Sequence, residues 1–118
     1  METYRLFVYG TLKKGKGLNG VLGKSELFGD GWLKGFKMYD AGVPFVMQSN
    51  NPNDKVYGQI FLVNSSILAD VDEIEGHPYG YTRTWIPDQL GGVWIYLQSA
   101  RWGSLLNNRE IKSGIWEN

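Results

Sequence analysis

The sequence predicts an α+β fold, in which one curved sheet or small barrel carries a single well-formed helix. Glycine (16 residues) and aromatic residues (14%) are abundant and spread along the chain, which suits tightly turned strands. Only one segment, residues 64–75, has a clear helical pattern. The repeated alternation of strand and helix that a doubly wound sheet requires does not occur.

Strands are expected wherever aromatic and β-branched residues form short runs between glycines and polar turns. The first run, YRLFVY, is the most apolar, and we expect it to be a central strand. Loops are expected at residues 10–20, with a short helical turn near residues 18–22, and at residues 49–55. The predicted strands are residues 4–9, two or three strands within residues 25–47, and residues 56–63, 81–87 and 93–98.

The predicted helix, NSSILADVDEIE, has signals at both ends. Asn64 or one of the two serines after it can cap the N-terminus, and Gly76 followed by Pro78 ends the helix. At 3.6 residues per turn, one apolar stripe runs along the helix. It consists of Ile67, Leu68, Val71 and Ile74.

Length and charge exclude several classes of protein. The 118 residues suit one domain, residues 1–118. Twelve basic residues balance twelve acidic ones, which gives no reason to expect nucleic acid or an anionic membrane as a partner. The absence of cysteine excludes disulfides and thiolate chemistry, and no apolar run approaches the roughly 18 residues of a membrane span. We therefore expect a cytoplasmic protein, whose oligomeric state the sequence leaves open.

Residues 10–16, GTLKKGK, match the first seven positions of the phosphate-binding P-loop. The eighth position, which should be a serine or threonine, is Gly17, and the following glycines disfavour the helix that a P-loop needs. Two alternatives are a plain surface loop and a turn whose backbone N–H groups bind an anion such as a carboxylate.

Three acids, Asp72, Glu73 and Glu75, end the predicted helix, where the helix dipole disfavours negative charge. On an ideal helical wheel Glu75 lies about 50° from the centre of the apolar stripe. Partial burial and the dipole would both raise its pKa toward the range useful for proton transfer. The alternative is that Glu75 pairs with Arg83 or a lysine, or points to water. Asp72 and Glu73 are expected to be solvated, and His77 to be a turn residue.

Two segments together resemble the γ-glutamylcyclotransferase-like (AIG2-like) family. LFVYGTLKKG is similar to that family's YGTL strand and loop, and IEGHPYGYTR to its acidic helix end followed by a Tyr-x-Arg strand. VYGQIFLV and VWIYLQ match further strands, so the resemblance covers residues 4–98.

This resemblance implies a small mixed β-barrel with one main helix alongside, and a lyase that releases 5-oxoproline and a free amine from a γ-glutamyl amine or amide. Glu75 would be the general acid and base. The γ-glutamyl substrate would be bound by Tyr9, Gly10, Thr11, Leu12, Asn19, Tyr81, Arg83 and Tyr96. No metal and no cofactor would be required. A non-catalytic module on the same fold, binding a small molecule or a protein, is the alternative. The segment AGVPFVM, residues 41–47, departs from the family's Pro-Gly pair, and we expect it to alter the pocket wall.

Overall fold

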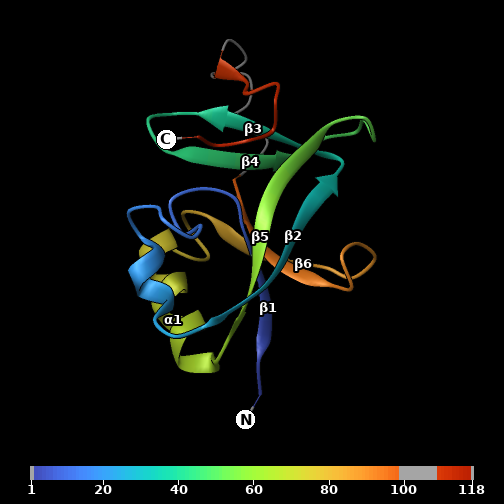
Figure 1. The fold of residues 1–118 in the computed structure, drawn as a ribbon. Helices are drawn as coiled ribbons and strands as arrows, with labels where there is room; N and C mark the ends of the chain where they lie inside the picture. The colour runs from blue at the N-terminus through green and yellow to red at the C-terminus, as the bar shows by residue number, and fades with distance from the viewer. Residues whose placement is uncertain (1, 99–108, 118) are drawn as a thin grey trace.

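The computed structural model describes residues 2–98 and 109–117, which form two sheets and one α-helix (Figure 1). The elements in chain order are β1 (Tyr4–Val8), the 3-10 helix η1 (Asn19–Leu22), β2 (Glu26–Lys34), β3 (Phe36–Asp40), β4 (Pro44–Gln48), β5 (Lys55–Val63), α1 (Ser65–Glu75), β6 (Thr82–Ile86) and β7 (Val93–Leu97).

The larger sheet has the strand order β2-β5-β1-β7-β6, so β1 is its central strand as predicted. β1 pairs in antiparallel fashion with β5 and in parallel fashion with β7, which makes the sheet mixed. β3 and β4 form a separate antiparallel ribbon. This ribbon lies across one end of the large sheet, while α1 and η1 lie together at its side (Figure 1).

Both faces of β1 are covered, because its side chains alternate between two apolar clusters. Leu6 and Val8 pack in one cluster with Leu68 and Val71 of α1. Phe7, on the other face, packs in a second cluster with residues of β2 to β5 and β7 and with Trp116. A central strand buried on both faces explains the nearly continuous apolar run of the sequence.

The structure confirms the α+β class and the mixed sheet, and its described residues contain the single α-helix that was predicted. Residues 25–47 form three strands, and the short helical turn is η1. Closure into a barrel stays a prediction, since no ladder joins the edge strands β2 and β6 within the described residues. One expectation was wrong: Ile74 leaves the buried stripe, with 47% of its surface exposed, because the last turn of α1 borders a cavity instead of the sheet.

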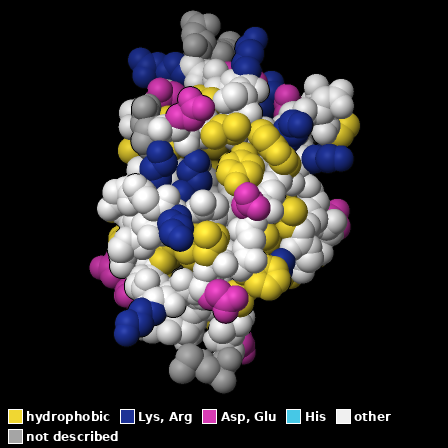
Figure 2. All heavy atoms as spheres, viewed as in Figure 1, with side chains coloured by type: hydrophobic (Ala, Val, Ile, Leu, Met, Phe, Trp, Pro, Cys, Tyr) yellow, Lys and Arg dark blue, Asp and Glu magenta, His cyan; other side chains and the backbone are white. Residues whose placement is uncertain are grey.

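The surface carries both signs of charge. On the face shown in Figure 2, Lys and Arg side chains are interspersed with Asp and Glu side chains, and hydrophobic side chains form patches between them. Among the described residues, no helix is long and apolar enough to cross a membrane.

Candidate active site

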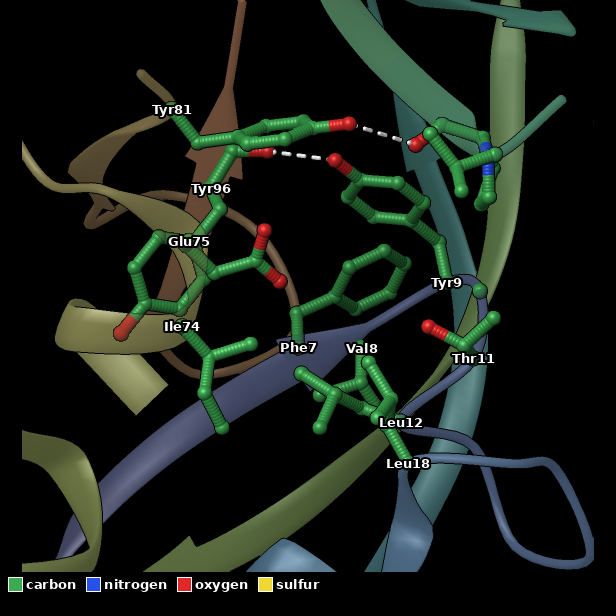
Figure 3. A pocket seen from close by; sticks show the side chains of 13 residues that line it. Phe7, Val8, Tyr9, Thr11, Leu12, Leu18, Ile74, Glu75, Tyr81 and Tyr96 are labelled. Atoms are coloured by element: carbon green, nitrogen blue, oxygen red, sulfur yellow. Dashed lines mark hydrogen bonds between the residues drawn. The ribbon is translucent and has the colours of Figure 1, made fainter. Parts of the chain in front are cut away.

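A cavity of about 220 Å³ opens at the C-terminal end of β1. Four parts of the chain form its walls: the end of β1 with the loop after it, the turn into β4, the end of α1, and the segment from Tyr81 to β7 (Figure 3). The lining residues are Phe7, Val8, Tyr9, Gly10, Thr11, Leu12, Leu18, Val43, Pro44, Ile74, Glu75, Tyr81 and Tyr96. Glu75 is the only charged residue among them.

The end of α1 is fixed by the Gly-His-Pro-Tyr-Gly segment that follows it. Gly76 adopts the left-handed conformation (φ 71°), as the sequence predicted for a helix-ending glycine. The chain then turns back, and the N–H of Tyr81 donates to the carbonyl oxygen of Glu75 at 3.0 Å. A Cβ on Gly80 would lie 2.7 Å from that same oxygen, so only glycine fits there. This turn holds the backbone of Glu75 against the cavity.

The carboxyl group of Glu75 points into the cavity (Figure 3). Desolvation by the surrounding apolar and aromatic side chains raises its pKa from 4.5 to about 7. The upward shift of this pKa agrees with the prediction from the helical wheel, and burial of the carboxyl group causes it. Pairing with Arg83, the alternative weighed above, does not occur, because Arg83 binds Asp72. Glu75 can therefore exchange a proton near neutral pH.

Three tyrosines line the cavity, but each donates its hydroxyl hydrogen to another protein group. Tyr9 donates to the carbonyl oxygen of Tyr96 at 2.7 Å, and Tyr81 to that of Pro44 at 3.0 Å (Figure 3). Tyr96 donates to Oδ1 of Asp72 at 2.6 Å. Burial raises the pKa of Tyr81 to about 12 and that of Tyr9 well above its ordinary value. The tyrosines thus shape the cavity, and Glu75 is the described lining residue whose pKa lies near neutral pH.

Asp72 was expected to be solvated, and this prediction was wrong. Nε of Arg83 donates to one of its carboxylate oxygens at 2.8 Å and a terminal nitrogen donates to the other at 3.1 Å, while Tyr96 supplies a third bond. Burial opposes ionisation of Asp72, but the hydrogen bonds from Arg83 and Tyr96 prevail and lower its pKa. The guanidinium also lies over the Trp94 ring, 4.7 Å from its centroid. Asp72 therefore fastens α1 to β6 and β7.

Replacing Asp72 with asparagine should destabilise the protein, because Arg83 would keep a half-buried charge without its partner. Hydrogen bonds to charged groups contribute roughly 1.5–3 kcal/mol each, so we expect a loss of about 2 kcal/mol in the free energy of unfolding at pH 7. Urea denaturation measures it. Asp70→Asn, an exposed position on the same helix, is the control. Equal stability of the two variants would contradict the fastening role.

The loop after β1 passes close to β4. A Cβ on Gly10 would collide with the ring of Pro44, so glycine is required for this approach. Asn19 lies outside the cavity wall, and its side chain donates to the carbonyl oxygen of Leu12 at 2.8 Å. Within the described residues, no acceptor meets the backbone N–H groups of Thr11 and Leu12. Asn19 thus supports a turn that has donors to offer an anion.

The lysines of the P-loop match do not face the cavity. Lys13 is buried and donates to the carbonyl oxygen of Trp116 at 2.7 Å, and Lys16 donates to that of Glu117 at 3.0 Å. The next helical element, η1, begins only at Asn19. This geometry favours the anion-binding turn over the P-loop.

No group of three or more His, Cys, Asp and Glu side chains in the described ranges is placed to hold a metal ion.

The comparisons with known proteins agree with this geometry. Residues 6–118 match the family model described as "Gamma-glutamyl cyclotransferase, AIG2-like". The chain belongs to this family. A relative from Vibrio cholerae, named "Putative gamma-glutamylcyclotransferase", is 34% identical over 94% of this chain and 93% of its own length.

Two solved structures share the fold of this gamma-glutamyl cyclotransferase family member. The crystal structure of an uncharacterized protein from Pyrococcus horikoshii has a TM-score of 0.78 and 26% identity, covering 96% of this chain and 89% of its own. That of an AIG2-like protein from Mus musculus has a TM-score of 0.72 and 22% identity, covering 86% and 83%. At its lower identity the mouse structure supports the fold alone.

The structure brings most of the predicted site residues together. Tyr9, Gly10, Thr11, Leu12, Glu75, Tyr81 and Tyr96 line one cavity. Asn19 and Arg83 do not line it. Asn19 donates to the carbonyl oxygen of the lining residue Leu12, and Arg83 binds Asp72, which in turn accepts a hydrogen bond from the lining residue Tyr96. Phe7, Val8, Leu18 and Ile74 also line the cavity, although no sequence signal marked them as site residues. Val43 and Pro44 belong to the segment expected to alter the pocket wall, and they do form part of it.

Proposed function

We propose that the protein is a γ-glutamyl cyclotransferase-type lyase that converts a γ-glutamyl amine or amide to 5-oxoproline and a free amine. The observation that carries the proposal is a single carboxyl group, with its pKa raised to about 7, in a cavity whose tyrosine donors are already engaged. Family membership supports the same reaction class.

In the reaction, the substrate's α-amine attacks its own γ-carbonyl carbon. Glu75 in its ionised form takes a proton from the α-ammonium group, a new C–N bond closes the five-membered ring, and the bond to the departing nitrogen breaks. The same carboxyl group gives its proton to the departing nitrogen as that bond breaks. The attacking nitrogen loses its second proton when it becomes the ring amide, and the released amine takes up that proton and leaves as an ammonium ion. Because both reacting groups belong to one molecule, holding them in the reactive orientation supplies much of the rate.

The turn after β1 would hold the glutamyl moiety. The N–H groups of Thr11 and Leu12 can donate to the substrate carboxylate or to the carbonyl oxygen as negative charge develops on it. Tyr9, Tyr81 and Tyr96 would enclose the ring-forming atoms. Asn19 and Arg83 would act through Leu12 and Asp72 and would not touch the substrate.

The direct test uses chromatography to measure the release of 5-oxoproline from a panel of γ-glutamyl amines and γ-glutamyl peptides. We expect 5-oxoproline and the free amine in equal amounts from at least one member of the panel. If glutamate or 5-oxoproline shifts the thermal unfolding of the protein but no panel member is cleaved, the fold serves as a non-catalytic binding module instead.

A further inference from the structure

Three partly exposed apolar side chains converge at the mouth of the cavity. Ile74 is 47% exposed, Leu18 40% and Val43 52%. Single exposed apolar residues are common on protein surfaces, but these three come from three separate segments and line one cavity. Figure 3 shows Ile74 and Leu18 flanking it, from α1 and from the loop after β1.

Each of the three side chains is placed by a defined local structure. Ile74 directly precedes Glu75 in the last turn of α1. The N–H of Leu18 donates to the carbonyl oxygen of Thr11 at 2.9 Å, which ties it to the anion-binding turn. Val43 sits at the tip of the β3–β4 ribbon, where its carbonyl oxygen accepts from the N–H of Ala41 at 3.0 Å. The mouth is therefore a built part of the site.

From this arrangement we infer that the mouth is a subsite for an uncharged apolar substituent, alkyl or aryl, on the departing amine. The inference rests on the proposed function, which puts the glutamyl moiety at the polar end of the cavity beside Glu75 and the turn. The departing group then extends toward Leu18, Val43 and Ile74. Among the described lining residues no basic side chain is present to pair with a carboxylate on the departing amine.

The test uses γ-glutamyl derivatives of n-pentylamine, 1,4-diaminobutane and 4-aminobutanoate. These departing amines have similar lengths but end in a methyl, an ammonium and a carboxylate group. We expect kcat/KM for the pentyl compound to exceed that for each charged compound by at least about 10-fold, the lower range of discrimination by an apolar pocket. Equal values for the three compounds, or a preference for a charged one, would overturn the inference.

Val43→Lys is the decisive variant, since an exposed ribbon tip tolerates lysine and the change puts a positive charge at the mouth. It should reduce the preference for the pentyl compound over the carboxylate compound about 10-fold. Leu27→Lys, at a 38% exposed position on the edge strand β2 away from the cavity, is the matched control and should leave the preference unchanged. An unaltered preference in Val43→Lys would also count against the subsite.

A binding measurement distinguishes failure of this inference from failure of the proposed reaction. Calorimetry with the Glu75→Gln protein ranks the three compounds without turnover. Tighter binding of the pentyl compound, with no 5-oxoproline formed by the wild-type protein, would leave the apolar subsite standing and remove the lyase. Release of 5-oxoproline at equal rates from all three compounds would support the lyase and overturn the apolar subsite. If the protein neither bound nor cleaved any of the three, both proposals would be overturned.

Discussion

Glu75→Gln should lower kcat for 5-oxoproline release by roughly 10²–10⁴-fold, the usual contribution of a positioned general acid and base. Glutamine has the same shape as glutamate but neither takes nor gives the proton. No tyrosine of the cavity can replace it, because the hydroxyl hydrogens of Tyr9, Tyr81 and Tyr96 are donated to other protein groups. Steady-state kinetics at pH 8 on the best panel substrate measures the loss.

Glu73→Gln is the matched control, since it removes the same charge from an exposed position two residues away on the same helix. It should retain kcat within about twofold of the wild type. For the wild type, kcat/KM should fall as the pH drops below about 7, because protonated Glu75 cannot accept the substrate's proton. Equal losses in the two variants, or a kcat in Glu75→Gln within about twofold of the wild type, would remove Glu75 from the mechanism.

Local geometry was enough to predict that Glu75 leans toward the interior, whereas its role as the acid and base rested on the family resemblance and stays a prediction. A helical wheel and two helix-ending signals place residue 75 at the edge of an apolar stripe, and these features survive in the folded chain. The prediction of which residues form the buried stripe was less accurate. The wheel describes one helix in isolation, so it could not show that Ile74 extends past the sheet into a cavity mouth.

The role of Asp72 depends on contacts that no local pattern contains. Its partners Arg83 and Tyr96 lie 11 and 24 residues further along the chain, on two strands whose pairing brings them beside α1. In the same way, the contact between Gly10 and Pro44 arises because the β3–β4 ribbon lies across the end of the sheet. Such contacts follow from the tertiary arrangement, which sequence periodicity does not describe.

The buried carboxyl group should also make stability depend on pH. In the unfolded chain Glu75 ionises near pH 4.5, whereas in the folded protein it ionises near pH 7. Between these values only the unfolded state loses the proton, so the free energy of unfolding decreases as the pH rises, and it levels off above pH 7. A pKa difference of one corresponds to about 1.4 kcal/mol, so ionised Glu75 costs the folded state up to ~3 kcal/mol.

Urea denaturation of the wild type and Glu75→Gln at pH 5 and pH 8 tests this cost. The glutamine variant should be more stable than the wild type by ~2–3 kcal/mol at pH 8, and the difference should shrink toward zero at pH 5. Asp72 contributes in the opposite direction and at lower pH, because its pKa is lowered and its stabilisation is lost on acidification. Subtracting the two curves cancels that contribution, since both proteins contain Asp72.

The same substitution would then strongly lower kcat and increase stability, a combination that few explanations other than a desolvated catalytic carboxylate produce. If Glu75 merely stabilised the helix end, its replacement would lower the free energy of unfolding of the protein at both pH values. The exposed control Glu73→Gln should show neither effect. A wild-type protein whose stability relative to Glu75→Gln is the same at pH 5 and pH 8 would show that the carboxyl group is solvated, and the case for proton transfer by Glu75 would fall with it.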